Sequence, residues 1–257
     1  MPLRRYQFGG LGQTTCVRLT VIGCSPAWPN PGGAQSGYLV ENDGERLLLD
    51  CGPGVLARLR EGDNHGWPSV GAIAITHFHL DHCGDLVPWA WGLMHGPGQD
   101  AQRPQLWVPP GGRDVLRDFG ERFGFEDMFE RVFDVREYGD EQPFVAAGLT
   151  ITPVSVPHYD LLTFGLRVHN RRTSLAYSGD SGPSDRLAVL ARDVELFLCE
   201  ATLDDPEPDL RGHLTVDEML HAFEDSGARR LVVIHRPHEL ALDETLERAY
   251  DGLTITL

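Results

Sequence analysis

The first part of the chain alternates short apolar runs with turns rich in Gly, Pro, Asn and Asp, a pattern typical of β-strands. Two of the runs flank Asn42-Asp43-Gly44, which predicts a tight hairpin. The run Ala72-Ile73-Ala74-Ile75 is apolar throughout and predicts a strand buried on both faces. The predicted strands cover residues 17–22, 37–40, 46–49, 72–75, 105–108, 149–154, 164–168, 174–177, 194–199, 231–234 and 253–256.

Apolar residues recur at helical spacing in several stretches between these strands. The predicted helices cover residues 55–60, 84–94, 113–123, 185–191, 216–226 and 243–250. Strands dominate the start of each half and helices follow, which favours two mixed sheets packed face to face with helices outside. Because no short repeat or low-complexity linker interrupts the pattern, we expect residues 1–257 to form a single α+β domain.

Residue types that bind metals cluster directly after the strand at residues 72–75. His77, His79, Asp81 and His82 fall within six residues. Two His separated by one residue on an extended backbone point the same way, and the following turn can direct Asp81 and His82 to a second point nearby. Imidazole and carboxylate suit Zn²⁺ and similar divalent ions, and one such segment can serve two metals about 3.5–4 Å apart. A polar loop that is rich in His by chance is the alternative, and this register disfavours it.

This segment resembles the H-x-H-x-D-H signature of the metallo-β-lactamase superfamily, which stands complete at residues 77–82. Three later residues, His158, Asp180 and His235, match the remaining metal positions of that family. The resemblance implies a four-layer αβ/βα sandwich that binds two divalent metal ions, Zn²⁺ or else Mn²⁺ or Fe, at one edge. It assigns one metal to His77, His79 and His158, the other to Asp81, His82 and His235, and the bridging position to Asp180. Asp50 matches a family position that supports the ligands from behind.

Two further segments indicate a branch of the family. Leu198-Cys199-Glu200-Ala201-Thr202 and Gly212-His213-Leu214-Thr215 resemble the phosphodiesterase branch that includes the tRNA 3′-processing endonucleases. There, a His in a Gly-His-Ser-Thr loop pairs with an upstream Glu and helps protonate the leaving group, although here Leu214 replaces the Ser. The resemblance implies that Glu200 and His213 are catalytic, with Asp81 orienting the attacking hydroxide. A surface Glu and a His that merely precedes a helix are the alternative.

Charge and chain length restrict the substrate. The chain has 38 acidic residues against 22 Lys and Arg, a formal charge of −16, which argues against the broad basic surface that grips long nucleic acid. The tRNA-processing members carry a long basic arm between the third metal His and the bridging Asp, whereas residues 159–179 must already hold a strand and a turn here. We therefore expect a metal-bound hydroxide to attack the phosphorus of a small phosphodiester, with a cyclic nucleotide as one candidate.

Other functions stay open at this point. The superfamily also hosts thioester, lactone and β-lactam hydrolysis, so the ligands alone do not name the substrate. Processing of tRNA 3′ ends and metal or RNA binding without catalysis are further alternatives. Trp28 lies in a long loop after the first strand, where it could stack on a base or anchor the loop.

Five scattered cysteines, odd in number and without a Cys-x-x-Cys motif, indicate reduced thiols and a cytoplasmic protein. No apolar run is long enough to cross a membrane, and the N-terminal residues lack the apolar core of a signal peptide. We therefore expect no membrane partner. Members of the family are often dimers, so the resemblance also allows a homodimer.

Overall fold

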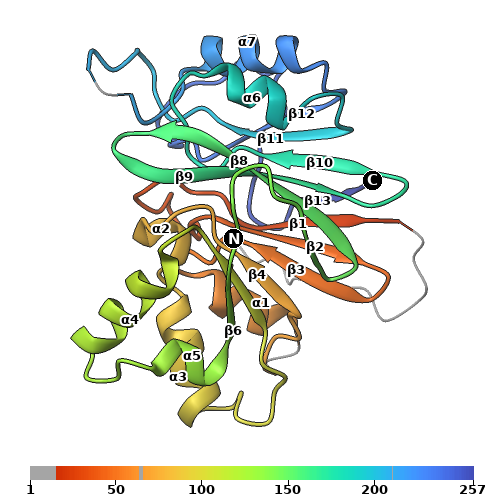
Figure 1. The fold of residues 1–257 in the computed structure, drawn as a ribbon. Coiled ribbons are helices and arrows are strands. Elements are labelled where there is room, and N and C mark those ends of the chain that lie inside the picture. Colours follow the sequence, from red (N-terminus) through yellow and green to blue (C-terminus); the bar gives the residue numbers. More distant parts are fainter. Residues whose placement is uncertain (1–15, 64–65, 210) are drawn as a thin grey trace.

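The computed structural model describes residues 16–63, 66–209 and 211–257. Two sheets pack face to face, and helices cover the outer side of each sheet (Figure 1). This arrangement confirms the four-layer αβ/βα sandwich expected from the sequence.

The first sheet combines the N-terminal half of the chain with the C-terminal strand. Its seven strands, in spatial order, are β13 (Thr254–Thr256), β1 (Arg18–Gly23), β2 (Gly37–Asn42), β3 (Glu45–Leu49), β4 (Ala72–Ala74), β5 (Gln105–Val108) and β6 (Asp134–Glu137). In the β2–β3 hairpin, Asp43 and Gly44 have φ of 48° and 86°, the positive pair that a two-residue turn of this hand requires. The hairpin prediction is confirmed.

The second sheet is built from the later strands. In spatial order they are β12 (Leu231–Ile234), β11 (Leu196–Glu200), β10 (Ser174–Tyr177), β9 (Leu161–His169), β8 (Leu149–His158) and β7 (Phe144–Ala146). β10, β11 and β12 run parallel, whereas β7, β8, β9 and β10 are joined antiparallel. The predicted strands for this sheet are all present, and the sequence pattern missed only the short β7.

Helices form the two outer layers. They are α1 (Val55–Gly62), α2 (Leu80–Cys83), α3 (Leu86–His95), α4 (Gly112–Arg122), α5 (Met128–Val132), α6 (Asp185–Leu190) and α7 (Val216–Ser226). α1, α3, α4 and α5 pack on the first sheet, and α6 and α7 pack on the second (Figure 1). Within the described part of the chain, no helix combines the length and apolar character needed to cross a membrane.

Strand β4 shows how burial in the core fixes the position of a strand. Ala72 and Ala74 face the apolar layer between the two sheets, whereas Ile73 and Ile75 face the layer under the helices. Both faces of the strand are therefore buried, as its uninterrupted apolar sequence predicted. Burial on both faces holds the residues that follow β4 in a defined position.

The prediction of a helix at residues 243–250 is wrong. Asp243 Oδ1 accepts hydrogen bonds from the N–H and hydroxyl of Thr245, which forms a local turn in place of a first helical turn. Val233 N–H then donates to Glu247 O, and Ala249 N–H donates to Val233 O, both at 2.8 Å. The segment thus covers the free edge of β12, and pairing with that edge replaces the intrahelical hydrogen bonds.

Helix α7 begins with a capping box. The hydroxyl of Thr215 accepts from the N–H of Glu218 at 3.4 Å, and the Glu218 carboxylate accepts from the N–H of Thr215 at 3.0 Å. These contacts satisfy backbone N–H groups that a helix start otherwise leaves unpaired.

We predict that Thr215→Ala lowers the free energy of unfolding by about 1 kcal/mol, because the N–H of Glu218 loses its acceptor. Thr215→Ser keeps the hydroxyl and should stay close to the parent protein. Urea titration followed by circular dichroism measures both variants. Equal stability of Thr215→Ala and Thr215→Ser would show that the cap contributes nothing.

Candidate active site

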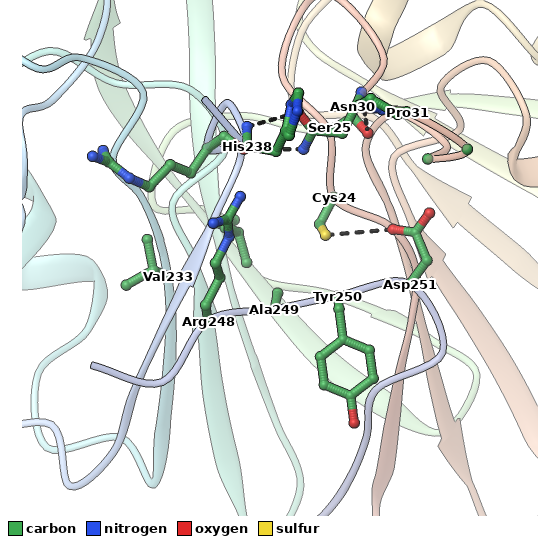
Figure 2. Close-up of a pocket in the computed structure, with 14 residues that line it drawn as sticks. Cys24, Ser25, Asn30, Pro31, Val233, His238, Arg248, Ala249, Tyr250 and Asp251 are labelled. Carbon is green, nitrogen blue, oxygen red and sulfur yellow. Dashed lines mark hydrogen bonds between the residues drawn. The ribbon is translucent and has the colours of Figure 1, made fainter. Parts of the chain in front are cut away.

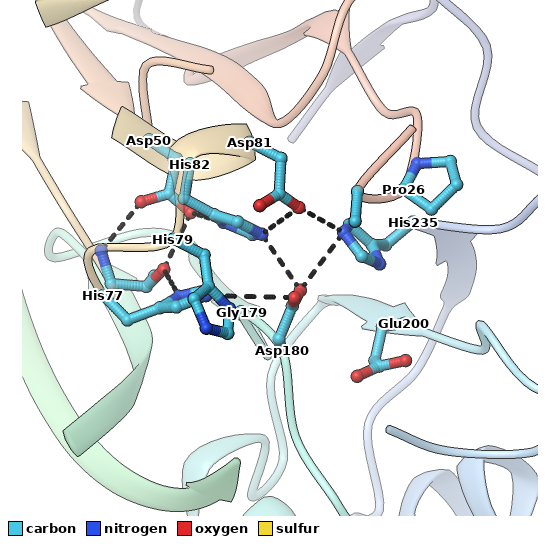
Figure 3. Close-up of polar contacts among 12 residues, drawn as sticks. Pro26, Asp50, His77, His79, Asp81, His82, Gly179, Asp180, Glu200 and His235 are labelled. Carbon is cyan, nitrogen blue, oxygen red and sulfur yellow. Dashed lines mark hydrogen bonds and ion pairs between the residues drawn. The ribbon is translucent and has the colours of Figure 1, made fainter. Parts of the chain in front are cut away.

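Ligand-type side chains gather where four strands end at one edge of the sandwich. β4 leads into His77, β8 ends at His158, β10 leads to Asp180, and β12 leads to His235. The short helix α2 adds its N-cap residue His79 and, from its first turn, Asp81 and His82. Figure 3 shows side chains from these separate segments pointing toward one another.

These seven side chains form two groups that share Asp180. The first contains His77, His79, His158 and Asp180, and the second contains Asp81, His82, Asp180 and His235. Within each group the potential ligand atoms all lie within 4.8 Å of one another. The structure therefore brings together every predicted metal-binding residue, in the two sets that the resemblance implied.

The two carboxylate oxygens of Asp180 face different groups. Its Oδ2 lies 3.9 Å from Nε2 of both His77 and His158. Its Oδ1 lies 3.2 Å from His82 Nε2 and 3.5 Å from His235 Nε2. This is the arrangement by which one carboxylate can bridge two cations.

The donor set fits divalent cations. Three buried atoms at this point, His77 Nε2, His82 Nε2 and Asp180 Oδ1, have no hydrogen-bond partner among the described residues. Buried polar atoms nearly always have partners, and imidazole and carboxylate together are typical ligands of Zn²⁺ and related ions. Burial also lowers the pKa of His77, which favours the neutral ring that a metal requires.

Asp50 orients one side of the site. This fully buried carboxylate accepts from the Thr76 N–H at 2.7 Å, the Thr76 hydroxyl at 2.8 Å and the Tyr177 hydroxyl at 2.6 Å. It also lies 2.7 Å from His82 Nδ1, which directs the opposite nitrogen of His82 toward Asp180. The Thr76 hydroxyl lies 3.0 Å from His77 Nδ1 and directs that ring in the same manner.

Glu200 has a matching role on the other side. Its Oε2 accepts from the Thr202 hydroxyl at 2.7 Å, and that hydroxyl lies 3.0 Å from His235 Nδ1. Each side of the site thus contains a buried carboxylate that reaches a ligand-type His through a Thr hydroxyl. The sequence interpretation missed both Thr76 and Thr202, although Thr76 directly precedes His77 and Thr202 lies two residues after Glu200.

His213 pairs with Glu200, as expected. Its Nδ1 lies 2.9 Å from Glu200 Oε1, which also accepts from the Ser181 N–H at 2.8 Å. The His213 ring lies 4.9 Å from the ring of His158 and 5.6 Å from that of His235, so it adjoins both groups. Burial opposes the charge on His213, but the negative charge and hydrogen bond of Glu200 outweigh it and raise the pKa to about 9.

Glu200, His213 and His235 also have potential ligand atoms within 4.8 Å of one another. Glu200 and His213 are already paired with each other, and the His235 Nε2 lies 3.2 Å from Asp81 Oδ2. We therefore interpret Glu200 and His213 as a hydrogen-bonded pair beside the two ligand groups.

The loop before His213 is held by its neighbours. The Gly212 carbonyl lies 2.6 Å from His158 Nδ1, and the Gly212 N–H donates to Glu207 at 3.1 Å. The Tyr159 hydroxyl donates to the same carboxyl group at 3.0 Å, and a Cβ at Gly212 would overlap the Tyr159 ring. Leu214, which replaces the Ser of the family motif, is fully buried in the core beneath α6 and α7.

Trp28 does not anchor its loop by burial, because 52% of its surface is exposed. The side-chain amide of Gln35 instead holds the loop by donating to the carbonyls of Pro26 and Ala27 at 3.2 and 2.6 Å. Pro26 lies beside His235 in Figure 3. A contact between Trp28 and a substrate stays a prediction.

A family model described as "Beta-lactamase superfamily domain" matches residues 45–236, a range that contains all seven ligand-type residues and the Glu200–His213 pair. The chain belongs to the metallo-β-lactamase superfamily. It is therefore related to metal-dependent hydrolases, and the family resemblance found at residues 77–82 is confirmed.

Several proteins resemble this superfamily member over most of their length. An uncharacterized protein of Mycobacterium tuberculosis, Rv1339, is 35% identical over 95% of this chain and 90% of its own. The probable metallo-hydrolase YhfI of Bacillus subtilis is 26% identical over 86% of this chain and 88% of its own.

Solved structures show the same fold. The crystal structure of YhfI from Bacillus subtilis matches with a TM-score of 0.81 at 21% identity, covering 94% of this chain and 99% of that one. The short form of human tRNase Z matches with a TM-score of 0.68 at 22% identity, covering 93% of this chain and 98% of that one.

We predict that Asp180→Ala loses most of the bound divalent metal, because both ligand groups lose their shared carboxylate. Asp118→Ala removes an exposed carboxylate on α4 and serves as the control. Elemental analysis of the purified proteins measures the change. Full metal content in Asp180→Ala would contradict the bridging role.

We further predict that Asp50→Asn weakens metal affinity by about 10–100-fold, the usual effect of removing a group that orients a ligand. Asp63→Asn changes a carboxylate that pairs with Arg46 instead, and it should keep the affinity of the parent protein. Competition with a fluorescent chelator gives both affinities. Parent-like metal affinity in Asp50→Asn would show that Asp50 does not support the metal ligands.

Proposed function

We propose that this protein is a two-metal hydrolase of a small phosphodiester, with a cyclic nucleotide as the candidate substrate. The observation that carries the proposal is the Glu200–His213 pair, at 2.9 Å, bordering both ligand groups. A phosphodiester releases an alkoxide that needs a proton, and this pair is an acid suited to provide it.

The seven ligand-type residues would hold two divalent cations, which is the role that the resemblance gives them. Such cations, when bound, neutralise phosphoryl oxygens and supply an activated water as the nucleophile. Asp81 borders this region, with its Oδ2 at 3.4 Å from His82 Nε2 and 3.2 Å from His235 Nε2. We assign to Asp81 the orientation of the attacking water.

His213 would deliver the proton. Its Nδ1 is engaged by Glu200, so Nε2 is the nitrogen available for the leaving oxygen. The Glu200 carboxylate stabilises the protonated imidazole, and the Ser181 N–H fixes the same carboxylate. The first effect keeps His213 charged before the reaction, and the two together limit its rotation.

The short connection between His158 and Asp180 supports a small substrate. Residues 159–179 contain β9 and β10, which are joined by a turn closed by the Asn170 N–H and the Thr173 carbonyl at 3.0 Å. No basic arm emerges between the third ligand-type His and the bridging Asp. With a formal charge of −16, this disfavours tRNA and other long nucleic acids as substrates.

We predict that His213→Ala keeps its metal but loses turnover by about 10²–10⁴-fold on a cyclic nucleotide, because an alkoxide leaving group depends on the acid. The loss should be smaller on bis(p-nitrophenyl) phosphate, since p-nitrophenolate leaves without a proton. His221→Ala alters an exposed His on α7 and is the matched control. An equal loss on both substrates would contradict the role of His213 as the acid.

A substrate panel tests the reaction class. It contains both phosphodiesters, a thioester, a lactone, a β-lactam and a precursor tRNA, each assayed with Zn²⁺, Mn²⁺ or no added metal. We expect metal-dependent turnover of the small phosphodiesters. Turnover of only the esters or the β-lactam would favour the alternative hydrolase, and turnover of only the tRNA would favour 3′-end processing.

A further inference from the structure

A cavity of about 530 Å³ lies between the loop after β1, the residues that follow β12 and the segment before β13 (Figure 2). Its lining includes Asn30, Arg236, His238 and Arg248, and none of the ligand-type residues or the Glu200–His213 pair. Its size is in the range of small-molecule sites. The function proposed above does not use it.

Two arginines line this cavity without a carboxylate partner. Arg236 is only 3% exposed, and its guanidinium donates to the backbone carbonyls of Ala201 and Ala241. Its Nε has no hydrogen-bond partner among the described residues. Arg248 donates to the carbonyl of Pro237 at 3.4 Å, and within the described ranges neither arginine forms an ion pair.

A buried guanidinium without a counter-charge is costly. An external anion would supply the missing charge.

The acidic residue that lines the cavity, Asp251, is already engaged. Asp251 pairs with Arg58 and accepts from the Ala34 N–H and the Cys24 thiol. Glu239 lies 3.0 Å from His238 Nδ1. Figure 2 shows the Arg248 side chain reaching into the opening, away from Asp251. The side of the cavity that contains Arg236 and Arg248 is therefore open to an anion, whereas the charge of Asp251 is already balanced by Arg58.

We propose that this cavity binds a small phosphorylated compound, with Arg236 and Arg248 contacting its phosphate group. Guanidinium groups match the geometry of a phosphate, and two of them match its double charge. The volume beyond the arginines leaves room for the organic part of a phosphate monoester. Asn30 closes the site by accepting from the His238 N–H at 2.9 Å and donating to the Arg236 carbonyl at 3.1 Å.

Calorimetric titration of inorganic phosphate into the metal-loaded protein tests the site. The metal centre also attracts phosphate, so the same titration is made on Asp180→Ala, in which binding at the cavity should persist. Arg248→Gln should weaken phosphate binding at the cavity at least tenfold, by about 1.4 kcal/mol or more. Arg171→Gln removes an exposed arginine of the β9–β10 turn and should leave phosphate binding at the cavity unchanged. Equal titrations of the two arginine variants, or loss of all phosphate binding in Asp180→Ala, would overturn the proposal.

A second measurement does not depend on the folding of a variant. A crystal of the metal-loaded protein soaked in selenate, a tetrahedral dianion, should show an anomalous peak between Arg236 and Arg248. A soaked crystal without that peak would rule the site out.

Discussion

The two oxygens of Asp180 face two separate groups of histidines, and the organisation of the site follows from this division. Oδ2 faces His77 and His158, whereas Oδ1 faces His82 and His235. These groups come from both sheets, so they can share one carboxylate only where the sheets meet at an edge. Five clustered imidazoles and unpaired buried atoms would be unfavourable in a purely structural role, and divalent cations provide the physical reason for their convergence.

The rest of the site holds these side chains in place. Asp50 acts on His82 directly and on His77 through Thr76, and Glu200 acts on His235 through Thr202. Glu200 differs from Asp50 because its other oxygen contacts His213. The buried Glu200 carboxylate thus contacts two parts of the site. It orients the ligand-type residue His235 through Thr202, and it contacts His213, which we propose as the acid. Changes at Glu200 are therefore expected to affect both metal binding and proton transfer.

Parts of this account could be predicted from local sequence and others could not. The apolar run before His77 and the spacing through His82 are local signals, so the strand and the motif were predictable from the residues themselves. His158, Asp180 and His235 are single residues at strand ends, and only the family resemblance identified them. The helix predicted at residues 243–250 was wrong because pairing with the edge of β12 overrides local helical propensity. Arg236 and Arg248 line one cavity only through packing, and no sequence pattern joins them.

The central claim is that Asp180 bridges two cations beside the Glu200–His213 pair. Anomalous diffraction at the zinc edge, from a crystal grown with Zn²⁺, tests it most directly. The account predicts two peaks about 3.5–4 Å apart, one on each side of the Asp180 carboxylate. A single peak would contradict the bridge, and a peak bound by Glu200, His213 and His235 would contradict the assignment of His213 as an acid.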